Sequence, residues 1–144
     1  MGNPIKVFLV DDHLLFRMGL KSALSDSGDR FVVTGEAASG AELLEHLPTL
    51  DADVVILDEA SAFADPECEA QVQLAFQEMA KGRTVIMIAH RLSTIRIADR
   101  IYVLKDGRVD EQGKHDELLQ KNGLYAAMWA EYQKAVNWKV GEMA

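Results

Sequence analysis

Three short runs of apolar residues, rich in β-branched side chains, constrain the fold of this chain more than any other feature. They occupy residues 7–10, 54–57 and 85–88. Unbroken runs of this length are typical of strands buried on both faces, as the central strands of a parallel sheet are. They are far shorter than the ~20 apolar residues that span a bilayer. The sequence therefore predicts an α/β fold with these strands at the centre of the sheet.

Amphipathic stretches alternate with these runs along the chain, as in βα units built on a parallel sheet. We predict strands at 6–10, 31–36, 53–58, 84–89 and 100–104, and helices at 14–24, 40–47, 66–80, 92–98 and 115–136. Residues 105–108 predict a tight turn that leads into a short extra hairpin strand near 109–112. Because the chain has 144 residues and no linker-like stretch, we expect a single domain, 1–144, with one core.

The net charge and the cysteine content indicate which partners and which cellular compartment to expect. The formal net charge is −8, without the clustered Lys and Arg that phosphate neutralisation needs, so no nucleic-acid partner is expected. The single cysteine, Cys68, excludes an internal disulfide and fits a reducing, cytoplasmic setting. We predict no membrane segment, no obligatory partner and a monomer, with a domain-swapped dimer as the alternative.

An acidic pair follows the first predicted strand, and an aspartate ends the third. The segments 11–13 (Asp-Asp-His), 16–20, 32–37 (Val-Val-Thr-Gly-Glu-Ala) and 53–58 (Asp-Val-Val-Ile-Leu-Asp) together resemble the receiver domain of bacterial response regulators. The resemblance implies that Asp11 and Asp12 bind Mg²⁺ and that Asp58 accepts a phosphoryl group. It also implies a receiver-like role for Lys105, which ends the fifth predicted strand.

From about residue 51 onward, the chain resembles the C-terminal part of the nucleotide-binding domain of ABC exporters. The matching segments are 55–67 (Val-Ile-Leu-Asp-Glu-Ala-Ser-Ala-Phe-Ala-Asp-Pro-Glu), 82–94 (from Gly-Arg-Thr to His-Arg-Leu-Ser-Thr) and 103–119. The resemblance implies a Walker B strand that ends at Asp58, a catalytic glutamate at Glu59 and a switch histidine at His90.

The two resemblances overlap on residues 51–58, a strand that both families spell alike. We therefore predict an engineered chimera, with a receiver-derived part at 1–58, an ABC-derived part at 59–144 and the junction within 51–58. The sequence contains no Gly-x-x-x-x-Gly-Lys-Ser/Thr loop to cradle a triphosphate. From this we expect no native catalytic function, no enzyme activity and no cofactor, with Glu59 and His90 vestigial.

Two alternatives stay open. The first is a receiver-like module that binds Mg²⁺ weakly through Asp11, Asp12 and Asp58 and is phosphorylated at low yield on Asp58, since oxygen ligands of this kind suit Mg²⁺. The second is residual ATP binding.

The order of the strands bears on the metal site. We predict a three-layer, flavodoxin-like sheet of five parallel strands in the order 2-1-3-4-5, because a short right-handed βαβ unit prefers adjacent strands. Neighbouring strands lie ~4.8 Å apart, which would bring Asp11 and Asp58 together. The order 2-3-4-1-5 would separate them, and a strand exchanged with a second chain is the third alternative.

Overall fold

The computed structural model of the protein describes residues 2–58, 69–90 and 92–143. They form two compact units, Met1–His90 and Arg91–Ala144, each of which is described by itself. The predicted junction at 51–58 falls inside the first unit. That the whole chain forms a single domain stays a prediction.

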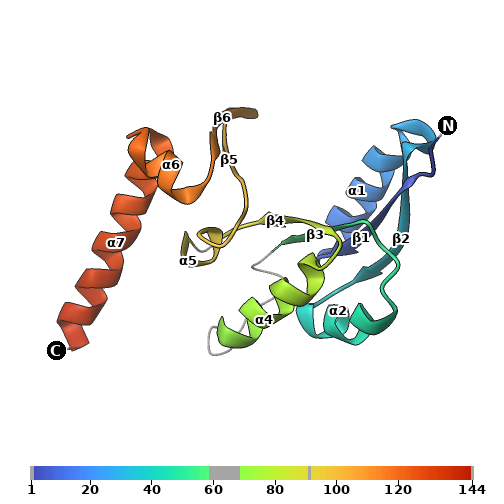
Figure 1. Ribbon diagram of the computed structural model, residues 1–144, viewed down its shortest axis with the longest axis horizontal. Helices are drawn as coiled ribbons and strands as arrows, with labels where there is room; N and C mark the ends of the chain where they lie inside the picture. Colours follow the sequence, from blue (N-terminus) through green and yellow to red (C-terminus); the bar gives the residue numbers. More distant parts are fainter. Residues whose placement is uncertain (1, 59–68, 91, 144) are drawn as a thin grey trace. The chain divides into compact units, whose positions relative to one another are not determined.

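The first unit alternates strands and helices, as the sequence predicts (Figure 1). Its elements are β1 (Ile5–Val10), α1 (Leu14–Ser25), η1 (Gly28–Arg30), β2 (Phe31–Ala37), α2 (Gly40–His46), η2 (Leu47–Thr49), β3 (Val54–Asp58), α4 (Glu69–Ala80) and β4 (Thr84–Ile88). The predicted start of α4 at residue 66 lies outside the described residues.

The four strands of this unit form a parallel sheet in the order β2-β1-β3-β4. Val10 of β1 lies opposite Ala37 of β2 on one side and opposite Leu57 of β3 on the other. This confirms the predicted order for the first four strands. The alternative 2-3-4-1-5 is wrong, because β1 pairs directly with β3.

Alternation along the strands places one apolar set on each face of the sheet. On one face, Val55 and Leu57 of β3 pack with Leu43 of α2 and with Phe76 and Met79 of α4. Figure 1 shows α1 on the opposite side of the sheet from α2 and α4. The first unit therefore has the three layers that the unbroken apolar runs predict.

The second unit holds α5 (Leu92–Ile95), β5 (Ile101–Lys105), β6 (Arg108–Gly113), α6 (His115–Gln120) and α7 (Leu124–Met143). Ile101, Val103, Leu118 and Tyr125 form its buried core. Here β5 pairs with β6 in an antiparallel hairpin and is not a strand of the four-stranded sheet. The predicted five-stranded, flavodoxin-like sheet of order 2-1-3-4-5 is therefore wrong in its fifth strand, whereas the extra hairpin strand near 109–112 is confirmed.

Backbone conformation at the turn explains this pairing. Asp106 and Gly107 have φ values of 52° and 76°, both in the left-handed region. A two-residue loop with positive φ at both positions matches the twist of an antiparallel hairpin. The chain is thereby folded back on β5, and β6 becomes the partner of β5.

A second left-handed residue divides the last predicted helix. Asn122 has a φ of 52° and separates α6 from α7, so the helix predicted over 115–136 is interrupted at Asn122 and Gly123, as the sequence of these two residues indicates. The final helix also continues to Met143, past the predicted end at residue 136.

Candidate functional site

Three polar residues of the first unit lie at the carboxyl ends of neighbouring strands. Asp11 follows β1, Asp58 is the last residue of β3, and His90 comes two residues after β4. In a parallel α/β sheet, loops at the carboxyl ends of the strands build the ligand sites. This edge is therefore the candidate functional site.

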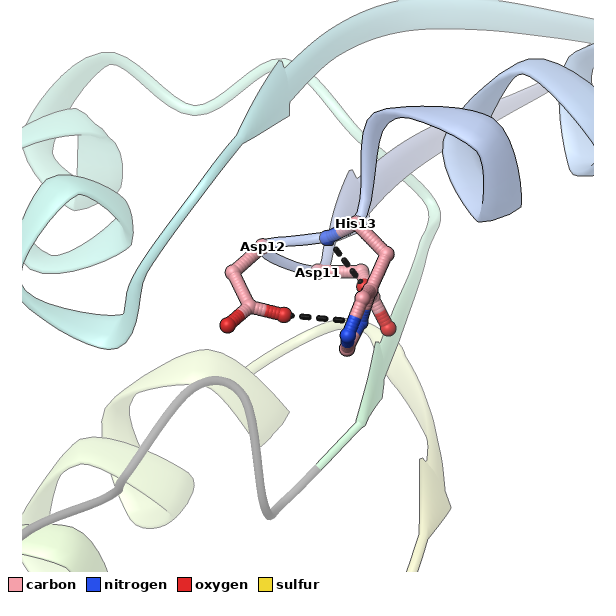
Figure 2. A group of neighbouring side chains, drawn as sticks. All are labelled: Asp11, Asp12 and His13. Atoms are coloured by element: carbon pink, nitrogen blue, oxygen red, sulfur yellow. Dashed lines mark hydrogen bonds and ion pairs between the residues drawn. The ribbon is translucent and has the colours of Figure 1, made fainter.

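Asp11 is the buried member of the site, with 2% of its surface exposed. Its Oδ1 accepts hydrogen bonds from the backbone N–H of His13 at 2.7 Å and from the ring nitrogen Nδ1 of His13 at 2.9 Å. Asp12 Oδ1 also lies 2.8 Å from that ring nitrogen. Figure 2 shows the three side chains converging, with potential ligand atoms that all lie within 4.8 Å of one another.

The two carboxylates perturb the histidine. A hydrogen bond to Asp11 raises the pKa of His13 above its usual value, and the negative charges of Asp12, Asp11 and Asp58 raise it further. His13 is therefore an exposed residue, 72% accessible, that lies beside the two carboxylates at this edge.

Asp58 has a different immediate partner. Its Oδ1 lies 2.8 Å from Nε2 of His90, and its side chain is 19% exposed. Because β3 and β4 are adjacent and in register up to Asp58 and Ile88, the end of β3 lies beside the residues that follow β4. The structure thus joins the residue that ends the Walker B-like strand to the histidine that the sequence predicts as a switch residue.

Arg17 of α1 contacts both the loop that follows β1 and a residue of β2. Its guanidinium donates to the carbonyl oxygen of Asp11 and, at 3.2 Å, to Glu36 at the end of β2. Lys21, one turn further along α1, also pairs with Glu36. These contacts fix α1 against β2 and hold the Asp11 loop in place.

The remaining predicted site residues are placed as follows. Glu59 lies outside the described residues. Asp11 and Asp12 gather with His13, while Asp58 is not a member of that group of ligand atoms, so a shared Asp11, Asp12 and Asp58 metal site stays a prediction. Lys105 ends β5 in the second unit, opposite Arg108, and its receiver-like role is untested.

Comparison with known proteins bears on the family. The mycobactin import ATP-binding/permease protein IrtA of Mycolicibacterium thermoresistibile is 46% identical over 110 residues, which cover 74% of this chain and 12% of that protein. An uncharacterized ABC transporter ATP-binding protein of Bacillus subtilis is 50% identical over 103 residues, or 69% of this chain and 17% of its own length. No known protein-family profile matches the sequence.

A solved structure is similar to this chain as well. A bacterial Atm1-family ABC exporter with ATP bound superposes with a TM-score of 0.50 at 44% identity, over 56% of this chain and 14% of that chain. Most of this chain is homologous to ABC transporter proteins. The matched part is a small share, between 12% and 17%, of the curated relatives described above.

These relatives correct two predictions. A designed chimera without native catalytic function is contradicted, because the relatives are ATP-binding proteins of natural ABC transporters. The stretch of 110 residues matched by the mycobactin import protein is also longer than residues 51–144, so it reaches into the part assigned to a receiver. The comparisons give no support to a receiver-derived part, and the prediction that the chain is not an enzyme is contradicted as well.

None of the helices in the described ranges 2–58, 69–90 and 92–143 is long and apolar enough to cross a membrane. The cytoplasmic location, the monomeric state and the lack of obligatory partners stay predictions.

Proposed function

We propose that this chain carries the metal-binding and histidine side of an ATP-hydrolysing site of the ABC transporter type. Asp58 is the Walker B aspartate of this proposal, His90 is the switch histidine and Glu59 is the catalytic glutamate. The observation that carries the proposal is the 2.8 Å contact between Asp58 Oδ1 and His90 Nε2 at the carboxyl edge of β3 and β4. The similarity to an ATP-bound ABC exporter supports it.

The reaction defines what these residues would do. Water attacks the γ-phosphorus of ATP, the bond from that phosphorus to the β,γ-bridging oxygen breaks, and ADP leaves with the electron pair while a proton passes to solvent. Catalysis of phosphoryl transfer depends on positioning and on neutralising charge. The imidazole of His90 can donate a hydrogen bond to a γ-phosphate oxygen, and Glu59 is assigned the orientation of the attacking water.

The donor set at this edge fits Mg²⁺. Asp58 has carboxylate oxygens at the end of β3, and Asp11 and Asp12 have carboxylate oxygens directly after the adjacent strand β1. Carboxylate oxygens are ligands that Mg²⁺ prefers. We propose Asp58 as the principal ligand, with Asp11 and Asp12 at the same edge. Mg²⁺, when bound there, supplies neutralisation of the phosphate charge.

The proposal is tested by phosphate release from Mg·ATP with the full chain. Because the sequence holds no glycine-rich phosphate loop, we expect binding near ~1 mM, equivalent to about −4 kcal/mol, and slow turnover. Asp58→Asn and His90→Ala should each lower phosphate release by about 10-fold or more, as loss of a group that stabilises the transition state does.

His46→Ala is the matched control, because His46 is an exposed histidine of the same unit, on α2 and outside the site. Its phosphate release should equal that of the wild type. Turnover that is absent at saturating Mg·ATP, or that falls equally in all three variants, would overturn the proposed function.

A further inference from the structure

The backbone of Asp11 is held from two sides. Its N–H donates to the carbonyl oxygen of Ala37 at 3.1 Å, which continues the pairing of β1 with β2 beyond Val10. Its own carbonyl oxygen accepts a hydrogen bond from the guanidinium of Arg17, which lies on α1. The first contact belongs to the sheet, whereas the second depends on a single side chain. Arg17 is therefore the side chain that fixes the direction in which the chain leaves β1.

The side chain of Arg17 is itself fixed. Only 12% of it is exposed, and its Nε donates to Oε1 of Glu36 at 3.2 Å while Nη1 donates to the Asp11 carbonyl oxygen. A guanidinium can hold two acceptors at once because its N–H groups form a rigid, planar fork. Glu36 is held in turn by an ion pair with Lys21. The contact with Asp11 is thus made by a side chain that has little freedom to move.

Asp11 has a nearly buried side chain, so the direction of its carboxylate depends on the backbone that carries it. Its Oδ1 accepts hydrogen bonds from the backbone N–H and the ring of His13, which ties the carboxylate to the same loop. Groups that hold a metal-ligating side chain in place matter for affinity, and their loss typically weakens metal binding by about 10–100-fold. A change in the orientation of this loop would therefore change how Asp11 can meet a cation.

We propose that Arg17 is a positioning residue for the cation site at the carboxyl edge of β1 and β3. By fixing the carbonyl group of Asp11, it holds the Asp11 carboxylate in an orientation suited to Mg²⁺. Arg17 acts through Asp11 and contacts neither the cation nor the nucleotide. The inference rests on the proposed function, because that proposal takes Asp11 as a ligand of the cation.

The charge of Arg17 and its positioning role make opposite predictions. A guanidinium close to a cation site repels the cation, so charge alone predicts that removal of Arg17 strengthens Mg²⁺ binding. Positioning predicts that its removal weakens Mg²⁺ binding. The sign of the change in affinity therefore separates the two effects.

The test titrates the full chain with Mg²⁺ alone and follows the backbone amide signals by NMR. Arg17→Met should weaken Mg²⁺ binding by about 10-fold. Lys21→Met is the matched control, because it removes a positive charge and a partner of Glu36 from the same helix without removing the contact between Arg17 and Asp11. Its Mg²⁺ affinity should not fall.

A second variant keeps the charge and changes only the geometry. Arg17→Lys has no planar fork with which to reach Asp11 and Glu36 through separate nitrogens, so it should also bind Mg²⁺ more weakly than the wild type. Circular dichroism and urea unfolding establish that each variant is folded under the conditions of the titration.

A double-mutant cycle tests whether Arg17 acts through Asp11. Asp11→Asn should weaken Mg²⁺ binding by itself. Adding Arg17→Met to it should weaken binding by less than about twofold more, because residues that act as a unit have effects that do not add. A general disturbance of the fold would instead lower the affinity in both backgrounds alike.

Several outcomes would count against the positioning role. Wild-type or tighter Mg²⁺ binding in Arg17→Met or Arg17→Lys would overturn it, as would an equal loss in Lys21→Met or full additivity with Asp11→Asn. A wild-type chain that does not bind Mg²⁺ would remove the cation site and this inference together. A chain that binds Mg²⁺ as described but releases no phosphate from ATP would refute the proposed function alone.

Discussion

His90 Nε2 lies 2.8 Å from Oδ1 of Asp58, so the residue that ends β3 is bound by the side chain that follows β4. The contact exists because the two strands are adjacent and in register to their last residues. Any cation that binds Asp58 must therefore compete with an imidazole for the same carboxylate.

This competition gives a prediction for Mg²⁺. His90→Ala should bind Mg²⁺ about twofold to fivefold more tightly than the wild type, because it removes the imidazole that contacts Asp58 Oδ1 at this partly exposed end of β3. Asp58→Asn should abolish the same binding. The affinity is measured by titrating the protein with Mg²⁺ and following the backbone amide signals by NMR. Equal affinities in the wild type and in His90→Ala would show that the imidazole does not oppose the cation, and His46→Ala serves as the unaffected control.

A second prediction concerns the titration of His13. Because Asp11 and Asp12 raise its pKa, the ring should titrate above the usual value of about 6.5, and Asp11→Asn should lower that midpoint. A raised pKa means that the stabilisation is present below the unfolded pKa and is lost as pH rises through the folded pKa. NMR of the imidazole protons measures it. An unchanged midpoint in Asp11→Asn would contradict the assignment of the cause.

For Glu36 we predict that the free energy of unfolding depends on pH with the opposite sign. Hydrogen bonding to Lys21 lowers the pKa of Glu36, and Arg17 adds to the effect. The pair therefore stabilises the fold above the unfolded pKa of about 4.3, and this is lost as pH falls through the folded pKa. Urea unfolding of the wild type and Glu36→Gln should differ at neutral pH and converge in acid. The same curve for Glu45→Gln, an exposed glutamate of α2, should match the wild type throughout.

Two adjacent leucines of α2 test the core. Leu43 is fully buried, whereas Leu44 is 41% exposed. Leu43→Ala should lower the free energy of unfolding by about 2–5 kcal/mol, because it leaves a cavity under the sheet. Leu44→Ala should change it by about 0.5 kcal/mol or less. Equal losses in chemical denaturation would mean that α2 packs by its other face.

Gly35 gives a prediction about close packing between strands. A Cβ at this position would lie 2.8 Å from Cε2 of Phe8, the residue opposite it on β1. Gly35→Ala should therefore cost about 1–3 kcal/mol, because the Phe8 ring is buried and must move. Gly19→Ala in α1, where the new methyl group meets nothing, should stabilise by about 0.5–1 kcal/mol. If a second substitution, Phe8→Leu, does not relieve the cost in Gly35→Ala, the clash is not its cause.

Much of the first unit follows from local pattern. The runs at 7–10, 54–57 and 85–88 are strands, and their neighbours along the sheet are as predicted, because a short crossover leaves few alternatives. The fifth strand was predicted wrongly for a reason visible in the chain. The turn at Asp106 and Gly107 and the hairpin strand that follows it were predicted, but the apolar pattern of β5 does not show whether that strand also joins the parallel sheet.

The sequence predicted which residues belong to the site better than it predicted the contacts between them. The receiver resemblance gave Asp11, Asp12 and Asp58 as metal-binding candidates, and the ABC resemblance gave His90 as a vestigial switch histidine. The contact between Asp58 and His90 depends on which strands are adjacent, which residue spacing alone does not determine. The contact of His13 with both carboxylates was not predicted, although its position directly after two aspartates was a signal for it.

The place of β1 between β2 and β3 has a consequence for biosynthesis. Of the described strands β1 is synthesised before the others, yet the backbone N–H of Lys6 donates to the carboxylate of Asp53, 47 residues later. Until that segment emerges, one side of the most apolar strand in the chain has no partner in the sheet. The hairpin of β5 and β6 closes within its own few residues. We expect the β5–β6 hairpin to form almost as soon as it is synthesised, whereas the sheet of the first unit can be completed only after β4 has been made.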